Sequence, residues 1–381
     1  MAMGVPRSDA VKPDPAAVTG VRVFTRMPVT LSWLSREVVP VARELTSQGA
    51  GQTYLRRGWL YGPHVDIIAR GIHRPGPDWK NVAARLHAEP VDPAKELSGE
   101  KYLRLAREFG RLEAVPPPYL PLREHGAVEF VRLADVGSRE PLLNEHQGIV
   151  LGALSQPFLH TIDELAADPS MATVRLAEAF AAIADVHPLG PGYGVLSLRS
   201  HAEAFLAWAA PTKDMRPAFT ERLAGEAPRL RAVVEQRISG EVDATAAAWR
   251  TALAYCSGAL DSAVATGALG LEMLDSVSNS IDRSLMGPPG APEVVPQGDS
   301  PDTEFHRAVD DSGLIDRPLP WFATYRLLIN LFYQQLPLLM VTPLQRYYMC
   351  HAIAETVDEV LGESWRDRLR RRPVPVGGRA A

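Results

Sequence analysis

The sequence has few of the residues on which metal, redox and disulfide chemistry depend. Its 381 residues include 2 cysteines and 10 histidines, and neither type occurs at the spacings of zinc sites or of a HExxH helix. The phosphate-binding loops GxGxxG and GxxxxGK[ST] are absent, and so is the nucleophile motif GxSxG. We therefore expect no metal and no cofactor. Cys256 and Cys350 lie in apolar helical segments and are interpreted as buried thiols of a cytoplasmic protein.

The sequence also lacks a long apolar run and a strong excess of charge. Its most apolar segment, 327–341, is interrupted by Asn330, Gln334 and Gln335, and it falls short of the roughly 18 apolar residues of a membrane span. The net charge is −5, and the one basic cluster is RDRLRRR at 366–372. We expect no membrane partner and no nucleic-acid partner, and we interpret the basic cluster as a solvated tail. No signal peptide is visible.

What remains is the composition of a folded globular protein, 46% hydrophobic and 22% charged. The ends, 1–20 and 362–381, are predicted to be flexible, and the second of them is basic. Between them, 21–361 is long enough for one large domain or two ordinary ones, and length alone does not choose. Within this region the Pro/Gly-rich stretch 286–302 is predicted to be a mobile loop.

The order of patterns predicts an α+β fold, in which helices pack on an antiparallel sheet and the C-terminal half is rich in helix. Up to about residue 133, helical pieces alternate with short β-like runs, namely VRVFT, TYLRRGWLYG, HVDIIARG and AVEFVRL. From about residue 170, apolar positions recur at the spacing of packed helices. We interpret GYGVLSLRS, 192–200, as a strand that leads directly into the next helix, with Ser200 and Glu203 as its capping box.

A pair of helices is predicted near the end of the chain, joined by Thr342 as an N-cap and Pro343 at the first helical position. One face of the first helix is apolar, and it comprises Tyr325, Leu328, Phe332 and Leu336. A second face carries Arg326, Asn330 and Tyr333 at one-turn and two-turn spacing. This second face is either exposed or partly buried, and in the second case it would offer fixed hydrogen-bond donors.

A base and a carboxylate lie side by side in WLYGPHVDIIARG, residues 59–71. In a strand, His64, Asp66 and Ile68 point to one face, because side chains alternate. The pair is either part of a catalytic site or a polar cover for the exposed side of a sheet.

Three segments together resemble the thiopeptide pyridine synthases, stand-alone relatives of the glutamate-elimination domain of lanthipeptide dehydratases. They are GYGVLSLRSHAEAFL, the helix with NLFY followed by PLQR, and WLYGPHVDIIARG. The resemblance extends over about residues 50 to 361. It implies the elimination-domain fold in a single catalytic domain, 21–361. It also implies a cytoplasmic, cofactor-independent enzyme of thiopeptide antibiotic biosynthesis.

The sequence departs from the wider family where glutamate elimination needs its side chains. The family strand usually reads Pro-His-(Ile/Leu)-Arg-(Ile/Leu)-Arg, whereas Asp66 and Ile68 stand at the two arginine positions here. Of the family's His-Met-x-x-Asn-Arg helix pattern, Arg326 to Leu331 retains only Asn330. These departures favour cycloaddition over elimination.

The resemblance implies that the protein joins two dehydroalanines of one peptide by a formal [4+2] aza-cycloaddition. Loss of water and of the leader peptide then gives a pyridine macrocycle. The diene requires an amide in its imidic-acid form, so the site needs groups that donate and accept hydrogen bonds. Positioning of the two alkenes can supply roughly 7 to 11 kcal/mol. The implied partner is a precursor peptide with a leader, dehydroalanines and azoles, while the oligomeric state stays open.

Two sets of candidate residues follow, and each also has an ordinary structural explanation in helix capping, helix packing or a polar helix end. The catalytic candidates are Tyr333, Arg326, Asn330, His201 and Ser197. The substrate-binding candidates are Arg199, His64, Asp66, Ser276, Asn279 and Arg283.

Two other functions remain open at this point. One is a split glutamate-elimination subunit of a tRNA-dependent peptide dehydratase, which would convert a glutamyl-serine peptide to dehydroalanine. The other is a non-catalytic protein that binds the precursor peptide, which would hold the leader without turnover.

Overall fold

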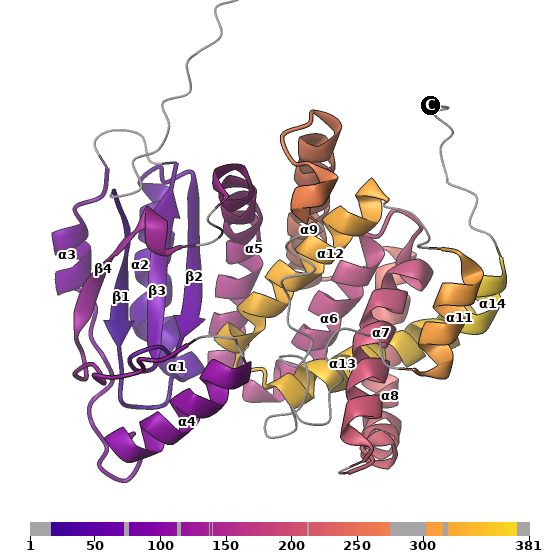
Figure 1. Ribbon diagram of the computed structural model, residues 1–381, viewed down its shortest axis with the longest axis horizontal. Helices are drawn as coiled ribbons and strands as arrows, with labels where there is room; N and C mark the ends of the chain where they lie inside the picture. Colours follow the sequence, from indigo (N-terminus) through magenta and orange to yellow (C-terminus); the bar gives the residue numbers. More distant parts are fainter. Residues whose placement is uncertain are drawn as a thin grey trace, which may run out of the picture.

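The computed structural model describes residues 17–71, 76–112, 116–136, 138, 140–211, 213–274, 302–314 and 319–371. A sheet half, formed by the N-terminal part of the chain, stands beside a larger helical half (Figure 1). The predicted α+β class, with helices dominating the C-terminal half, is confirmed.

The sheet is antiparallel, and its four strands occur in the order β2-β3-β1-β4. They are β1 (Val18–Phe24), β2 (Gln52–Gly58), β3 (His64–Arg70) and β4 (Val128–Arg132). Each of the β-like runs in the sequence therefore forms a strand. The central strand β3 is buried over six of its seven residues, from His64 to Ala69.

One face of the sheet is apolar and forms part of the core. Val21, Val23, Val65 and Ile67 are fully buried in one cluster with the helical segment that follows β1. That segment comprises α1 (Leu31–Trp33), a π-helical turn (Leu34–Val38) and α2 (Val39–Ser47). The short α3 (Trp79–Ala84) contacts β1 and β4. On the opposite face, Arg22, Arg56, Asp66 and Glu129 lie beside apolar residues such as Phe24 and Ile68, because side chains alternate along each strand.

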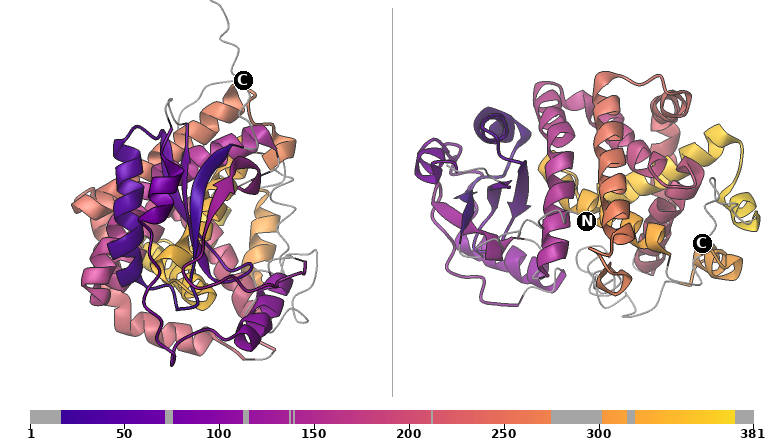
Figure 2. Two further views of the ribbon diagram at one scale, coloured as in Figure 1. Left: turned by 90° about the vertical axis from the view of Figure 1, so that its left-hand side faces the viewer. Right: turned by 90° about the horizontal axis from the view of Figure 1, so that it is seen from above.

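The long helix α5 (Pro141–Ala167) separates the sheet from the helices that follow α5 in the chain (Figures 1 and 2). It contacts β2 on one side and α9 and α12 on the other. Gly148 and Gly152 permit the approach to β2, because a Cβ at these positions would lie 2.3 Å from the Arg70 guanidinium and 2.9 Å from the Gln52 side chain. One apolar cluster consequently includes residues from the sheet and from the helices.

The helical half packs α7 against α13 and α6, while α8 and α9 flank α6. These helices are α6 (Ala172–Asp185), α7 (Pro191–Ala209), α8 (Arg216–Ser239), α9 (Ala244–Ala265), α12 (Pro320–Gln335) and α13 (Pro343–Leu361). Two shorter helices, α11 (Glu304–Ser312) and α14 (Trp365–Arg370), pack together on α7. Below the sheet in Figure 1 lies α4 (Gly99–Leu112).

The predicted strand at 192–200 is wrong, because this segment is the first half of α7. Pro191 starts the helix at its first position, and Ser200 lies in its interior, so Ser200 and Glu203 form no capping box. Gly194 explains the close packing of α7 on α6, since a Cβ there would lie 2.0 Å from the Ala184 carbonyl oxygen. A short apolar run fits a buried helix as well as it fits a strand.

The predicted last helix pair is confirmed in detail. Thr342 caps α13 by accepting a hydrogen bond from the Gln345 backbone N–H, and the Gln345 side chain accepts one from Thr342. The apolar face of α12 is buried as predicted, with at most 3% exposure at Tyr325, Leu328, Phe332 and Leu336.

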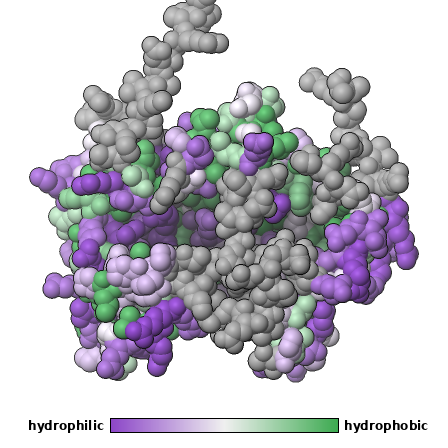
Figure 3. Space-filling view, in the orientation of Figure 1, coloured by the Kyte–Doolittle hydropathy of each residue, from purple (hydrophilic) through white to green (hydrophobic). Residues whose placement is uncertain are grey.

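The two terminal segments that were predicted to be flexible, 1–20 and 362–381, both include residues of the fold. β1 already begins at Val18, and the basic segment near the C-terminus contains α14. The surface over α11 and α14 is hydrophilic (Figure 3), yet Arg368 is only 3% exposed and forms an ion pair with Asp358. The solvated-tail interpretation is thus wrong for the first part of this segment.

Several predictions lie outside the described residues. They concern Ser276, Asn279, Arg283 and positions 286–301 of the predicted loop. The single-domain interpretation stays a prediction. In the described part of the chain, no helix combines the length and the apolarity that a membrane crossing requires.

Candidate functional site

Three helices bring a histidine, a tyrosine and a cysteine together. The Tyr333 hydroxyl on α12 lies 3.1 Å from Nδ1 of His201 on α7 and 3.1 Å from Sγ of Cys350 on α13. Tyr333 and Cys350 are buried, whereas His201 is partly exposed. We call these three residues the His201 cluster. Of the three side chains, the imidazole is therefore the one that reaches the surface.

Two arginines add positive charge to this region. The Arg346 guanidinium carbon lies 5.1 Å from the centre of the Tyr333 ring and 4.7 Å from that of Tyr347, within the range of cation–π attraction. Arg326 lies two helical turns before Tyr333 on α12. Burial, reinforced by the charges of Arg346 and Arg326, lowers the pKa of His201 to about 3. The imidazole is therefore neutral at pH 7.

The other two members of the cluster are neutral as well. Burial raises the pKa of Tyr333 well above its ordinary value, and it raises the pKa of Cys350 to about 12. A neutral chain of this kind has two hydrogen-bond directions. In one, Tyr333 O–H donates to Nδ1 of His201, which leaves Nε2–H as a donor. In the other, Nδ1–H donates to Tyr333 and Nε2 becomes an acceptor. The cluster can thus present either a proton donor or a proton acceptor at the same atom.

Two further candidates lie along the same helices. Ser197 precedes His201 by four residues on α7, so helix geometry places it on the face that carries the imidazole. Asn330 lies between Arg326 and Tyr333 on α12, and Ser197, Asn330 and Arg326 are all partly exposed. The predicted polar face of α12 is consequently neither fully exposed nor fully buried.

A second histidine contacts α7 next to the cluster. Nε2 of His306 on α11 lies 3.0 Å from the Ser200 hydroxyl, and its Nδ1 lies 2.7 Å from the Thr303 hydroxyl. Sequence reasoning missed His306 and the roles of Cys350 and Arg346. The spacing of Arg346 and Cys350, one helical turn apart, was a signal that both lie on one face of their helix.

Arg199 lies close to His201 in the sequence but has different partners. Its guanidinium forms ion pairs with Glu355 and, at 3.0 Å, with Asp358, both on α13. Its side chain is 5% exposed. These contacts connect α7 to α13, and they compensate the charge that we predicted for substrate binding.

The sheet carries a separate charged arrangement around Asp66. One carboxylate oxygen accepts a hydrogen bond from Nε of Arg22 at 2.7 Å, and the other accepts one from Nη2 of Arg56 at 2.7 Å. In register order, Arg56, Asp66, Arg22 and Glu129 face one another across the four strands, and we call them the charged row. Burial alone would raise the pKa of Asp66, but Arg22 and Arg56 lower it. Both carboxylate oxygens already have guanidinium partners.

His64 next to the charged row is a neutral, enclosed side chain. Burial, with the nearby positive charge of Arg22, lowers its pKa to about 4. Its Nδ1–H donates to the Gly62 carbonyl oxygen at 2.9 Å, and Nε2 lies 3.9 Å from the Asp66 carboxylate. A Cβ at Gly58 would lie 2.2 Å from Nε2, so only glycine leaves room for the ring. These contacts are those of a packed residue.

Metal-binding groups are not assembled at either place. Among the described residues, no three His, Cys, Asp or Glu side chains lie close enough together to hold a metal ion.

The fold is similar to that of a pyridine synthase. One similar solved structure is the pyridine synthase TbtD from thiomuracin biosynthesis, with a TM-score of 0.60, 21% identity and coverage of 90% of this chain and 98% of that chain. Another is TsrL, with a TM-score of 0.58, 17% identity and coverage of 94% and 99%. No family model and no curated protein matched the sequence. At these identities, the likeness is one of fold.

Proposed function

We propose that this protein is an enzyme of thiopeptide biosynthesis that forms the pyridine ring. The observation that supports the proposal is the likeness to TbtD, a pyridine synthase, over nearly the full length of both chains. In this proposal, two dehydroalanines of one leader-bearing peptide undergo a formal [4+2] aza-cycloaddition. Two carbon–carbon bonds form, one between the two CH2 carbons and one between the imidic carbon and the α-carbon of the second dehydroalanine. Water and the leader carboxamide then leave, so no oxidant is needed to reach the aromatic ring.

The His201 cluster offers chemistry that suits this reaction. The amide must lose a proton from nitrogen and gain one on oxygen to become the diene, and the leaving hydroxyl and leaving amide nitrogen each need a proton. With a pKa of about 3, the imidazole would not become charged at pH 7, but it could accept a proton at Nε2 while it passes the proton on Nδ1 to Tyr333. In this proposal, Nε2 of His201 exchanges protons with the substrate, and Tyr333 and Cys350 reset its tautomer.

The polar residues around His201 would position the peptide. Arg326, Asn330 and Ser197 are partly exposed on α12 and α7 and could donate hydrogen bonds to substrate carbonyl oxygens. Such positioning would lower the entropic cost of bringing the two alkenes together.

The test requires the precursor peptide encoded near the gene of this protein, after azole formation and dehydration. We expect mass spectrometry to detect free leader peptide and a product that has lost water and leader. A matched peptide with one of the two reacting dehydroalanines replaced by alanine should stay unchanged.

Unchanged mass of the full substrate would contradict the proposal. Conversion of a glutamyl-serine peptide to dehydroalanine would instead assign glutamate elimination. Tight binding of the leader with no turnover of any of these peptides would assign a precursor-binding protein.

A further inference from the structure

Arg346 lies beside the His201 cluster and has two tyrosine rings as its neighbours. It stands in the first turn of α13, where its backbone N–H donates to the carbonyl oxygen of Thr342. Its guanidinium carbon is 5.1 Å from the centre of the Tyr333 ring and 4.7 Å from that of Tyr347. The segment PLQR, to which the sequence alone assigns no chemistry, ends at this residue.

The positive charge of Arg346 is not matched by a nearby negative charge. Within the described ranges of the chain, no carboxylate forms an ion pair with it, and its Nε is buried without a hydrogen-bond partner. A positive charge in the first turn of a helix is also unfavourable, because the helix dipole is positive there. Arg199, by contrast, has Glu355 and Asp358 as partners. The described part of the fold thus leaves Arg346 without an anionic counter-ion.

The charge of Arg346 acts on both His201 and Tyr333. Burial lowers the pKa of His201 to about 3, and Arg346 is the charge that lowers it most. Burial and Cys350 raise the pKa of Tyr333, whereas Arg346 opposes that rise. The guanidinium therefore disfavours an imidazolium at His201 and favours a phenolate at Tyr333. Both effects make the Tyr333 hydroxyl the donor to Nδ1 of His201, which leaves the imidazole hydrogen on Nε2.

The other charged or titratable groups around His201 belong to three helices. They are Arg326 and Tyr333 on α12, Cys350 on α13 and His306 on α11. Arg326 and His306 also lower the pKa of His201, but by less than Arg346 does. The Arg326 guanidinium lies against a different ring, 5.4 Å from the centre of Phe322. Arg346 is therefore the cation that acts on the imidazole and also contacts the Tyr333 ring.

We propose that Arg346 is a positioning residue that serves as the counter-ion of a transient Tyr333 phenolate, so that the His201 cluster acts first as an acid and then as a base. This role rests on the proposed function. In the acid step, Nε2–H of His201 protonates the departing hydroxyl of the substrate, the carbon–oxygen bond breaks, and water leaves. The Tyr333 proton moves to Nδ1 at the same time, which produces the phenolate.

The base step returns the cluster to its starting state. Nε2 of His201 accepts a proton that the new ring loses, and the proton on Nδ1 returns to the Tyr333 phenolate. Each proton given to the substrate is thus recovered from it, and the imidazole carries no net charge before or after either step. Arg346 stabilises the phenolate between the two steps without touching the substrate.

The first test measures the tautomer and the pKa of His201 by ¹⁵N NMR of histidine-labelled protein without substrate. The His201 signal is identified by its loss in His201→Gln. In wild type we expect a neutral imidazole with its hydrogen on Nε2 at pH 7 and a pKa of about 3. Arg346→Met removes the charge and should raise this pKa by about one unit or more. Arg346→Lys retains the charge and should raise it by less than about half a unit.

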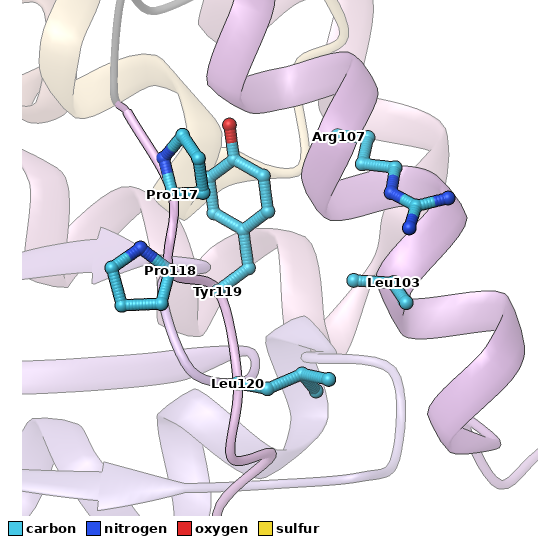
Figure 4. A pocket seen from close by; sticks show the side chains of 6 residues that line it. All are labelled: Leu103, Arg107, Pro117, Pro118, Tyr119 and Leu120. Atoms are coloured by element: carbon cyan, nitrogen blue, oxygen red, sulfur yellow. The ribbon is translucent and has the colours of Figure 1, made fainter.

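Two control variants each remove one guanidinium elsewhere. Arg222→Met removes a cation–π contact at 3.9 Å from the centre of the Tyr348 ring on α13. Arg107→Met removes an exposed arginine of α4 that lines an open depression with Leu103 and residues 117–120 (Figure 4). Both controls should leave the tautomer and the pKa of His201 as in wild type.

The second test measures turnover of the leader-bearing substrate. Arg346→Met should lower kcat about 100-fold with KM unchanged, because the phenolate loses its counter-ion. Arg346→Lys should restore kcat to within about tenfold of wild type, and Arg222→Met should retain the wild-type kcat. Near-UV circular dichroism identifies any variant that has lost its tertiary packing.

An Nδ1–H tautomer in wild type, an unchanged pKa of His201 in folded Arg346→Met, or an equal rise in the control variants would overturn the role of Arg346. The NMR test does not depend on cyclisation. The expected NMR results together with no cyclisation by wild type would contradict the proposed function alone. Cyclisation with equal kcat in wild type and Arg346→Met would contradict the role of Arg346 alone.

Discussion

The charged row of the sheet and the His201 cluster are both buried polar groups that include or adjoin a histidine, yet they are built in opposite ways. In the charged row, Asp66 is ionised and held between two guanidinium groups. In the His201 cluster, every member is neutral, and its hydrogen bonds can reverse direction. An ion pair in a fixed register resists rearrangement, whereas a neutral chain can redistribute protons with little separation of charge.

This contrast assigns different consequences to substitutions in the two regions. Changes in the charged row should alter mainly the free energy of unfolding, because buried charges that lose their partner are costly. Changes in the His201 cluster should alter mainly turnover, because its members keep their packing when one hydroxyl is removed.

The largest effect is expected from Asp66→Asn, which breaks the charged row. Arg22 and Arg56 then face each other across the strand without a carboxylate, and we expect a loss of about 3 kcal/mol in the free energy of unfolding. Urea denaturation measures it. Glu129→Gln, at the exposed end of the same row, is the control and should cost less than about 1 kcal/mol. Equal losses in both variants would show that Asp66 has no special place in the row.

A sharper contrast comes from Tyr333→Phe, which removes one hydroxyl from the His201 cluster and retains the ring. We expect kcat for cyclisation to fall about 100-fold, because Nδ1 of His201 loses the partner that sets its tautomer. Tyr325→Phe is the matched control on the same helix, where the hydroxyl donates to backbone carbonyl groups of Ile183 and Gly194. It should reduce stability with turnover unchanged. Similar kcat values in the two variants would contradict a role for the cluster in proton transfer.

The smallest expected effect is a change in the free energy of unfolding with pH, to which His64 contributes and Asp66 does not. The pKa of His64 is about 4 in the folded protein, against 6.5 for an unperturbed histidine such as that of the unfolded chain, so the unfolded state binds the proton first as pH falls. Stability is complete above pH 6.5 and is lost toward pH 4. From pH 7 to pH 5 we expect His64 to account for a decrease of about 1 to 2 kcal/mol.

Asp66 contributes nothing in this interval, because its folded pKa lies below the ordinary 3.8 and its stabilisation is lost only at lower pH. Denaturation of wild type and His64→Gln at both pH values measures the difference between their slopes. Identical slopes would contradict the assignment. Burial also lowers the pKa of His187 to about 4. His187 should therefore contribute equally to the pH dependence of stability in both proteins.

The sequence predicted elements whose signals are local. The alternation in HVDIIARG, the cap at Thr342 and the apolar face of α12 each depend on neighbours a few residues away, and each is confirmed. The Tyr333 and His201 candidates also prove to be in contact, although His201 lies on a helix that was interpreted as a strand and its exit.

Partners that lie far apart in the chain could not be predicted. Arg22 and Arg56 meet Asp66 through strand register, which the sequence does not specify without the fold. Cys350 reads as an ordinary buried thiol until α12 and α13 place it beside Tyr333. The prediction of a strand in α7 was wrong for another reason. Burial on most sides of the helix removes the periodicity that distinguishes helix from strand.

The packing of α7 on α13 has a consequence for synthesis in the cell. α7 ends at Ala209, but its main partner begins only at Pro343. At about 5 to 20 residues per second, the apolar side of α7 therefore waits roughly 7 to 30 s for its partner to emerge from the ribosome. During that interval Phe205 of α7 lacks the Tyr347 ring on which it stacks in the folded protein. A chaperone that shields this side chain would raise the yield of folded protein without touching the finished molecule.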